Sequence, residues 1–411
     1  MGMSAAALRC VLVGHVDHGK STLIGRILLE TKALPAGTLA EIRRVSKELG
    51  KDAELAFLTD QLQEERQREM TMDTTQRFFR TRRRPYVLID APGHAELIKH
   101  MLTGATLAEA AVLVVDVQHG AMEQTRRHAY LLDLLGLTRM LVAVTKMDTV
   151  AYDRAPFAQA DAQIRAVLGG LGLTPACVIP ISAREGINIG ARSRRMRWYA
   201  GPTLLQALDR LEPGARADLE PFRFPVQDVY DVDGTSVLVG RVVSGTVSLG
   251  QRVVALPSME ETRIRAIKVF GQHPVKAQAG ACVGLHCVPV LRLGRGHVLS
   301  EVRRTPRVSC EVRGKVFWLC DQPLTRGAAV RLRCTTQDAE AVVERIEGRV
   351  DSATLQPVES GVAELRRHEV GTVTLRTPRP LAVEASGGQQ ELGRFVLDAG
   401  DDVRGVGTIL D

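Results

Sequence analysis

The run Leu8-Arg9-Cys10-Val11-Leu12-Val13 and the octapeptide Gly14-His15-Val16-Asp17-His18-Gly19-Lys20-Ser21 after it decide the fold of the first half of the chain. The run has the length and nearly continuous apolar character of a buried strand. Residues Lys20–Glu30 carry apolar side chains at helical spacing. The octapeptide fits G-x-x-x-x-G-K-[ST], a glycine-rich loop that holds phosphates. A strand, this loop and a helix in that order predict a nucleotide-binding α/β domain.

Each residue type in this loop has a part in holding phosphates. Glycines let the backbone wrap around the phosphates, and the helix N-terminus adds a partial positive charge. Lys20 is placed to reach the β- and γ-phosphates, and the Ser21 hydroxyl is placed to ligate Mg²⁺. The complete motif in its strand–helix context disfavours a purely structural glycine turn. The predicted phosphate-binding residues are Gly14, His15, Val16, Asp17, His18, Gly19, Lys20, Ser21 and Thr22, joined by Gly93 further along.

Strand-like and helix-like segments alternate through the rest of the first half. The further apolar runs of strand length are Tyr86–Ile89, Ala110–Val115, Met140–Thr145 and Cys177–Ile181. The stretches with helical spacing are Ala95–Leu102, Glu123–Leu135 and Phe157–Leu168. This alternation predicts a mostly parallel sheet with helices on both faces. The residues between Thr31 and Thr75 show no strand pattern.

The segment Asp90-Ala91-Pro92-Gly93-His94 follows the apolar run Tyr86–Ile89. An acidic residue at the end of a strand beside a phosphate loop can hold a magnesium-bound water, which is the role predicted for Asp90. The Gly93 amide can meet the γ-phosphate and so report its presence. The alternative is an aspartate that only caps the next helix, and the phosphate loop upstream disfavours it.

Two further motifs at strand ends point to the nucleotide base. In Thr145-Lys146-Met147-Asp148, the Asp148 carboxylate can accept two hydrogen bonds from the N1 and N2 edge of guanine, which adenine cannot offer. The Lys146 stem can lie flat on the base. In Ser182-Ala183, the Ala183 amide can meet O6. The predicted guanine-binding residues are Thr145, Lys146, Asp148, Ser182 and Ala183.

The pattern changes around Glu212–Arg216. From Phe222 onward, short stretches with period-two character alternate with glycine turns, which is typical of sandwiches and barrels. A second turn-rich junction lies near Arg303–Arg307. We predict a nucleotide-binding domain over residues 1–214 and two small all-β barrel domains over 215–304 and 305–411.

The composition limits the class of protein further. The chain has 411 residues, 45% hydrophobic and 25% charged, which is ordinary for a soluble globular protein. No apolar run approaches the roughly 18–20 residues that span a bilayer, and no secretory signal is visible. The seven cysteines form no C-x-x-C pair, so we expect reduced thiols in a cytoplasmic protein rather than disulfides or a zinc site.

The net charge of +7 and the pI of about 9.2 invite a nucleic-acid interpretation. A net charge of +7 is small for a chain of 411 residues. Only 4% of the residues are aromatic, so few side chains are available to stack on bases. We therefore do not expect a nucleic-acid partner from composition alone.

Several segments resemble one branch of the translation-factor GTPases. The residues Gln124–His128, Met196–Leu205 and Phe222–Gln227 are similar to elongation factor one-alpha and to the GTPase (large) subunit of heterodimeric sulfate adenylyltransferase. The stretches closer to the sulfate-activating subunit are Arg126–His128, Arg77–Phe79 and Phe224–Gln227. The resemblance implies a P-loop GTPase domain followed by two β-barrels, with GTP and Mg²⁺ bound.

By the same resemblance, residues 65–73 form the first switch. Thr71 would be the second protein ligand of Mg²⁺, beside Ser21. His94 would be the catalytic residue that positions the attacking water, since a neutral imidazole can accept a water proton. Val16 and Met70 would form an apolar gate around it. The family usually has Gly where Glu69 stands and Asn where Thr145 stands.

The resemblance implies a GTPase subunit that couples GTP hydrolysis to the synthesis of adenylyl sulfate and diphosphate from ATP and sulfate. That synthesis would take place on a partner, a small adenylyltransferase subunit. The alternative is an elongation-factor-like GTPase that carries aminoacyl-tRNA. The sulfate-type motif variants favour the first, while the Gly14–Lys20 loop and the basic pI favour the second. A paralogue recruited to another pathway is a third possibility.

Overall fold

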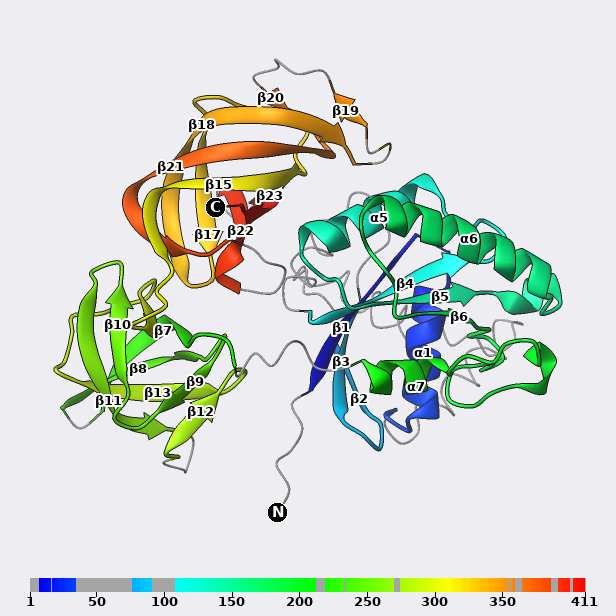
Figure 1. Cartoon of the computed structure of the whole chain (residues 1–411), viewed down its shortest axis with the longest axis horizontal. Helices are drawn as coiled ribbons and strands as arrows, with labels where there is room; N and C mark the ends of the chain where they lie inside the picture. The colour runs from blue at the N-terminus through cyan, green and yellow to red at the C-terminus, as the bar shows by residue number, and fades with distance from the viewer. Residues whose placement is uncertain are drawn as a thin grey trace, which may run out of the picture. The chain divides into compact units, whose positions relative to one another are not determined.

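The computed structural model describes residues 7–15, 17–34, 76–90, 108–211, 219–232, 234–269, 274–352, 354, 356–358, 364–385, 391–399 and 402–410. The chain divides into two compact units, Met1–Pro213 and Gly214–Asp411 (Figure 1). This division leaves the predicted boundary between residues 304 and 305 as a prediction. The predicted helix Ala95–Leu102 lies outside the described residues.

The first unit is built on one six-stranded sheet with the order β2-β3-β1-β4-β5-β6. All neighbours in it run parallel except β2 and β3, which are antiparallel. The central strands are apolar along their length because both faces of the sheet are covered. The strands are β1 (Leu8–Gly14), β2 (Gln76–Arg80), β3 (Pro85–Asp90), β4 (Ala110–Asp116), β5 (Met140–Thr145) and β6 (Cys177–Pro180).

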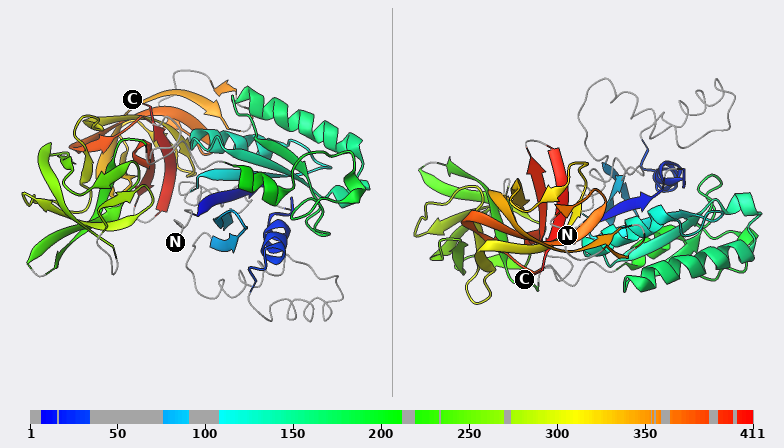
Figure 2. Two further views of the ribbon diagram at one scale, coloured as in Figure 1. Left: turned by 60° about the horizontal axis from the view of Figure 1, so that its bottom comes forward. Right: turned by 90° about the horizontal axis from the view of Figure 1, so that it is seen from above.

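Helices cover both faces of this sheet, as predicted. On one face α1 (Lys20–Glu30) and α7 (Leu204–Arg210) pack into the core formed with alternate residues of β1, β4 and β5. On the other face α5 (Glu123–Leu134) and α6 (Arg154–Gly170) contact each other and the central strands. Figure 2 shows α1 and α6 on opposite sides of the sheet. Short 3-10 turns cover Met147–Val150 and Arg194–Met196.

The first half of the second unit is a closed barrel with the strand order β10-β11-β13-β8-β7-β14. Alternate strand residues, such as Phe224, Val226 and Leu285, fill its interior. A separate two-stranded ribbon pairs β9 (Thr246–Ser248) with β12 (Lys276–Gln278). The barrel strands are β7 (Arg223–Val232), β8 (Thr235–Arg241), β10 (Arg252–Leu256), β11 (Glu260–Lys268), β13 (Cys282–Val288) and β14 (Val298–Glu301).

A second antiparallel system occupies the end of the chain, with the order β17-β22-β23-β15-β21-β18-β19. An additional pairing of β17 with β18 closes the first six strands of this order into a ring. The main strands are β15 (Arg307–Trp318), β17 (Ala329–Cys334), β18 (Gln337–Asp351), β21 (Glu369–Val383), β22 (Arg394–Ala399) and β23 (Asp402–Ile409). The short pieces are β16 (Leu324–Thr325), β19 (Pro357–Val358), β20 (Glu364–Leu365) and a 3-10 turn at Glu391–Gly393. The predicted fold class, an α/β nucleotide-binding domain followed by β-rich domains, is confirmed.

A buried ion pair joins the two β systems of the second unit. The Arg223 guanidinium, whose side chain is 4% exposed, donates from Nε to Glu384 Oε1 at 3.0 Å. Its Nη1 donates to the Ser300 hydroxyl at 3.0 Å. A small apolar cluster that includes Leu256 and Ala382 spans the same junction. Because the Arg223 side chain is buried, losing Glu384 would leave an uncompensated charge in the interior.

Candidate nucleotide site

Backbone geometry explains the two outer glycines of the phosphate loop. A Cβ atom added at Gly14 would lie 2.4 Å from the Val114 carbonyl oxygen, so the loop approaches β4 too closely for any side chain there. Gly19 is the N-cap of α1 and has a φ of 85°, in the left-handed region that glycine adopts at little cost. The chain therefore leaves β1, turns within a few residues and presents the N-terminus of α1 to the site.

Lys20 begins α1 and its side chain folds back into the loop. The ammonium Nζ donates to the Gly14 carbonyl at 2.7 Å and to the His15 carbonyl at 2.9 Å. Burial lowers the pKa of Lys20 to about 8, against the opposing influence of Asp90 and Asp17. A cation already held in this position suits a ligand that brings several negative charges, as a nucleotide's phosphates do.

His18 is the second buried titratable group of the loop. Its side chain contacts the Val114 carbonyl through Nδ1 at 3.3 Å. Burial lowers the pKa of His18 to about 4, so the imidazole is neutral at physiological pH. The ring packs in a stacked arrangement 5.9 Å from His119. His18 therefore contributes packing and an orientation, and no positive charge, at the phosphate site.

The residues at the head of α1 and the end of β3 fit the binding of Mg²⁺ with GTP. Asp90 ends β3 opposite Leu12 of β1, and its charge acts on Lys20, so it belongs to the phosphate end of the site. Ser21 lies in the first turn of α1. Magnesium there would neutralise part of the phosphate charge. Oxygen ligands of these two types are the ones Mg²⁺ prefers, so the donor set fits the ion.

Five predicted site residues, Val16, Met70, Thr71, Gly93 and His94, lie outside the described residues. Their roles as gate, magnesium ligand, phosphate contact and water-positioning group stay predictions.

The affinity for GTP is expected to fall as the pH rises above about 8. Phosphates stabilise the Lys20 ammonium and raise its pKa in the complex. Below about 8 the free protein already carries that proton, so affinity changes little there. Above it, binding must recapture a proton, and affinity falls by up to about tenfold per pH unit. Titration calorimetry at a series of pH values measures this.

The matched control for the pH series is Lys20→Arg. Its guanidinium stays charged throughout, while titration of the nucleotide itself is common to both proteins. A bend near pH 8 that persisted in Lys20→Arg would assign the effect to another group.

Thr145 joins the base end of the site to the phosphate loop. It is the last residue of β5 and is 1% exposed. Its hydroxyl oxygen lies 2.7 Å from the His18 carbonyl and 3.2 Å from the Val115 carbonyl. A hydroxyl has one proton to donate, so it serves these two acceptors less fully than the two protons of a carboxamide would.

Replacing Thr145 with valine is expected to weaken GTP binding by about tenfold. The change keeps the shape of the side chain but leaves the buried His18 carbonyl without its hydroxyl donor, at a cost of about 1–3 kcal/mol. Thr174→Val, at an exposed position, is the matched control. Binding of a fluorescent GTP analogue measures the effect. Equal affinities for the two variants would show that this contact does not support the loop.

Lys146 and Asp148 are oriented by neighbours that lie far away in the sequence. Lys146 has a left-handed φ of 58°, and its Nζ lies 2.9 Å from Asp116 Oδ2. Burial raises the pKa of the Asp116 carboxyl, but hydrogen bonds from Lys146 and the Gln118 amide outweigh it and hold that pKa below its usual range. The Ser182 hydroxyl donates to Asp148 Oδ1 at 2.6 Å. The structure thus brings the two predicted base motifs into direct contact.

Two residues of this region were not among the predicted site residues. Asp116 ends β4 and is the partner that fixes Lys146. Its place after a buried apolar run is the signal that also marked Asp90. Arg26 lies on α1 and donates to the backbone of the loop that carries Ala183. A single arginine on an amphipathic helix gives no comparable sequence signal.

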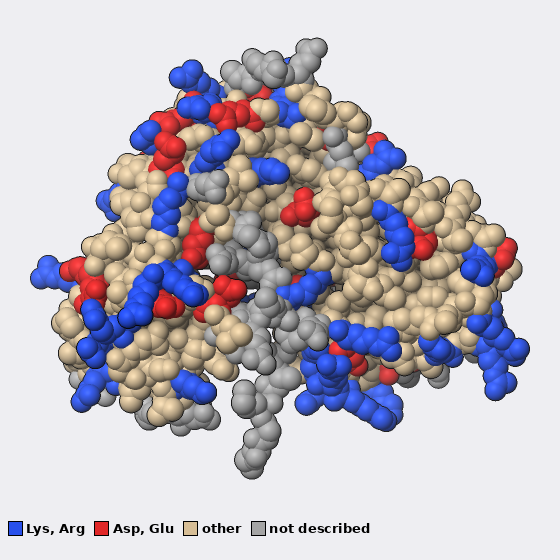
Figure 3. All heavy atoms as spheres, in the orientation of Figure 1, with Lys and Arg blue, Asp and Glu red and all other residues tan. Residues whose placement is uncertain are grey.

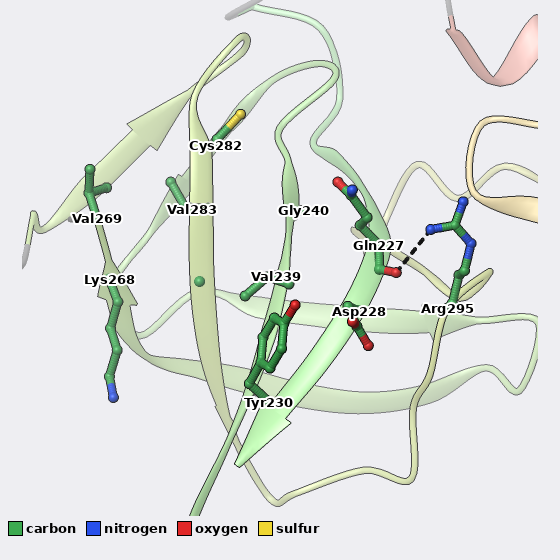
Figure 4. A pocket seen from close by; sticks show the side chains of 11 residues that line it. Gln227, Asp228, Tyr230, Val239, Gly240, Lys268, Val269, Cys282, Val283 and Arg295 are labelled. Atoms are coloured by element: carbon green, nitrogen blue, oxygen red, sulfur yellow. Dashed lines mark hydrogen bonds between the residues drawn. The ribbon is translucent and has the colours of Figure 1, made fainter. Parts of the chain in front are cut away.

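The barrel of the second unit has a surface hollow of about 410 Å³ (Figure 4). Asp228 and Tyr230 project into it from β7, and Lys268 lies across from them on β11. Arg295 donates to the Gln227 carbonyl at 3.3 Å and closes one side. The hollow combines an aromatic ring that is 54% exposed with groups of both charges. It is suited to a ligand that is itself polar and carries a ring.

Charge is mixed over the face of the molecule that Figure 3 draws. Figure 3 shows Lys and Arg side chains on both units with Asp and Glu among them, and a basic group over the turn between β2 and β3. Arg82 and Arg83 of that turn are exposed, whereas Arg84 is buried and donates to the Asp209 carbonyl at 3.2 Å. Over the described part of the chain, no helix is both long enough and apolar enough to cross a bilayer.

Two protein-family models match this chain. Residues 6–214 match the family model described as the elongation factor Tu GTP binding domain. Residues 311–410 match the model described as GTP-eEF1A C-terminal domain-like. These two matches cover both ends of the chain.

Relatives also match along nearly the whole length. Elongation factor 1-alpha of Methanosphaerula palustris is 33% identical, over 95% of this chain and 93% of its own. Elongation factor 1-alpha of Saccharolobus solfataricus is 35% identical, over 98% of this chain and 97% of its own. The bifunctional enzyme NodQ of a Rhizobium species is 34% identical over 95% of this chain, which spans 61% of that protein.

Proposed function

The chain belongs to the elongation factor Tu family of GTPases, which bind GTP with Mg²⁺, and from this premise we propose that it is a GTP-driven switch that carries aminoacyl-tRNA. The observation that supports this most is the match to elongation factor 1-alpha over nearly the full length, β domains included. A likeness confined to the GTPase domain would support nucleotide binding alone. This function was the alternative at the level of sequence, and the comparisons favour it over the sulfate-activating one.

The geometry of the first unit supports the nucleotide part of this function. The phosphate loop presents the α1 N-terminus and the Lys20 ammonium to one end of a nucleotide. Asp148, held by Ser182, supplies the acceptor for guanine at the other end. Thr145 ties the two ends together. We expect His94, which lies outside the described residues, to orient the attacking water for hydrolysis.

The hollow on the barrel supports the proposed binding of aminoacyl-tRNA. The end of an aminoacyl-tRNA combines an ammonium, a base ring and phosphates. Asp228 can pair with the ammonium, the exposed Tyr230 ring can stack on the base, and Lys268 and Arg295 can meet phosphate. Each of these groups has a complement in the hollow, which is why we assign the tRNA end to it.

A sulfate-activating GTPase subunit is the second candidate. It is favoured by the departures at Glu69 and Thr145 and by the sulfate-type segments. In the structure those segments are buried in part: Arg127 pairs with Glu123 at 3.1 Å within α5, and His128 and Phe224 are buried, whereas Phe78 is 68% exposed and Arg126 and Gln227 are exposed. The buried residues support the fold and are no evidence for a partner, whereas the exposed Phe78, Arg126 and Gln227 are accessible to one.

Binding of aminoacyl-tRNA to the purified chain tests the proposal. We expect submicromolar affinity with a non-hydrolysable GTP analogue and at least about a hundredfold weaker binding with GDP, because a switch must distinguish the two states. Tyr230→Ala should weaken tRNA binding by about tenfold without changing GTP affinity. Leu249→Ala, at a residue that is 51% exposed elsewhere on the barrel, is the matched control.

The second candidate predicts a different result in a paired assay. Mixed with a small adenylyltransferase subunit, ATP and sulfate, the chain would raise adenylyl sulfate synthesis in proportion to GTP. Synthesis that depends on GTP, together with tRNA binding that ignores the nucleotide state, would replace the first function with the second.

A further inference from the structure

Arg26 connects the helix of the phosphate loop to the loop that meets the base. It lies on α1, six residues after Lys20. Its Nε donates to the Ala183 carbonyl at 2.8 Å, and its Nη2 donates to the Arg184 carbonyl. One planar guanidinium therefore holds two consecutive carbonyls, a fixed geometry that guanidinium donors supply and that a single ammonium does not.

A second residue on the same face of α1 lies against the same loop. Glu30 follows Arg26 by one turn. A Cβ atom added at Gly190 would lie 2.8 Å from Glu30 Oε2, and one added at Gly186 would lie 3.0 Å from Glu30 Oε1. The loop thus runs in close contact with the α1 surface that carries Arg26 and Glu30.

The other anchors of the loop lie at its two ends and at Glu185, whose carboxylate pairs with Arg195 and whose N–H donates to the Ser182 hydroxyl at 3.3 Å. The Ser182 and Ile187 backbones exchange two hydrogen bonds, at 3.2 and 3.0 Å. Asn188 donates from its side chain to the Pro180 carbonyl at 3.0 Å. Between them, at Ala183 and Arg184, the carbonyls are fixed by Arg26. Its hydrogen bonds carry a charge on the donor and are therefore stronger than neutral ones.

We propose that Arg26 is a positioning residue for the guanine base: by holding the Ala183 and Arg184 carbonyls against α1, it fixes the distance between the base-contacting amide of Ala183 and the phosphate loop. The Ala183 N–H lies in the peptide plane next to the one that holds the Ala183 carbonyl, and only the φ and ψ of Ala183 separate the two, so fixing the carbonyl limits the directions in which that N–H can point. Because Lys20 and Ser21 begin the same helix, the base and phosphate ends of the site share one rigid support. Because Arg26 orders this loop before the nucleotide binds, nucleotide binding does not have to supply the free energy of ordering it.

This role makes a prediction that a general loss of stability does not. Inorganic pyrophosphate occupies only the phosphate loop, whereas GDP also meets the base loop. In Arg26→Met, GDP should bind about tenfold more weakly, and pyrophosphate should bind within about twofold of wild type. Arg26→Lys, which can reach one carbonyl, should fall between. Competition against a fluorescent GDP analogue, in the full-length chain with Mg²⁺, measures both ligands.

The matched control is Arg194→Met, at an exposed arginine of the same unit that donates no hydrogen bond in the described structure. Equal losses of GDP and pyrophosphate in Arg26→Met would assign Arg26 to general stability and overturn the proposal. GDP binding unchanged from wild type would also overturn it. A wild-type chain that bound pyrophosphate but showed no preference for GDP would instead refute the guanine site itself.

Discussion

Replacing Lys20 with alanine should reduce the affinity for GTP by about 10²–10⁴-fold. The ammonium is the cation held inside the phosphate loop, within 2.9 Å of two carbonyls that a bound nucleotide would displace it from. Two charge-assisted contacts to the β- and γ-phosphates, at about 1.5–3 kcal/mol each, account for the magnitude. Titration calorimetry with a non-hydrolysable GTP analogue measures it. Turnover at saturating GTP should fall as well.

Lys32→Ala provides the matched control, because Lys32 is exposed just beyond the other end of α1. It removes the same charge from the chain and should leave GTP affinity unchanged. If both variants lost affinity to the same degree, the loss would reflect net charge and not the phosphate loop.

The second large effect is expected from Asp148→Asn, which should change the preferred base. We expect the carboxylate to accept from N1 and N2 of guanine, and an amide cannot accept both. GTP affinity should fall by about 10²-fold or more. Xanthosine triphosphate carries a carbonyl in place of the exocyclic amine, so its affinity should rise by a similar factor. Ser182 can still donate to the amide oxygen, so the side chain keeps its orientation.

Competition between GTP and xanthosine triphosphate for a fluorescent analogue measures this exchange. Asp161→Asn, on the surface of α6, controls for the loss of one negative charge. Retained preference for GTP in Asp148→Asn would show that another residue reads the base.

The elements nearest the nucleotide were the most predictable from the sequence. The predicted bounds of α1 and β5 agree with the structure, those of β1 and β4 differ by one residue at one end, and those of β3 differ by one residue at each end. Continuous apolar runs identify these segments clearly, and glycines mark the turns that bound them. Helix α7 was not predicted, because seven residues are too few for a clear helical period. Its start depends on a capping box between Thr203 and Gln206.

The contacts that orient the site were less predictable. Motif spacing identified Thr145, Lys146 and Asp148 but not Asp116 or Arg26. Hydrogen bonds such as that from Arg26 to Ala183 join residues 157 positions apart, and sequence periodicity carries no information on such pairs. In the second half, period-two patterns predicted β structure. The strand order, and the pairing of β17 with β18 that closes the last sheet, arise from packing between distant segments.

The hollow on the barrel is lined by a cysteine, and this has a practical consequence. Cys282 is the one exposed thiol among the seven. Burial raises the pKa of Cys10, Cys287 and Cys334 to about 12, which keeps them protonated and slow to react. An alkylating reagent at neutral pH should therefore modify Cys282 first, without any engineered cysteine. A ligand bound in the hollow should slow this modification, and the modification rate, followed by mass spectrometry, therefore reports whether the hollow is occupied.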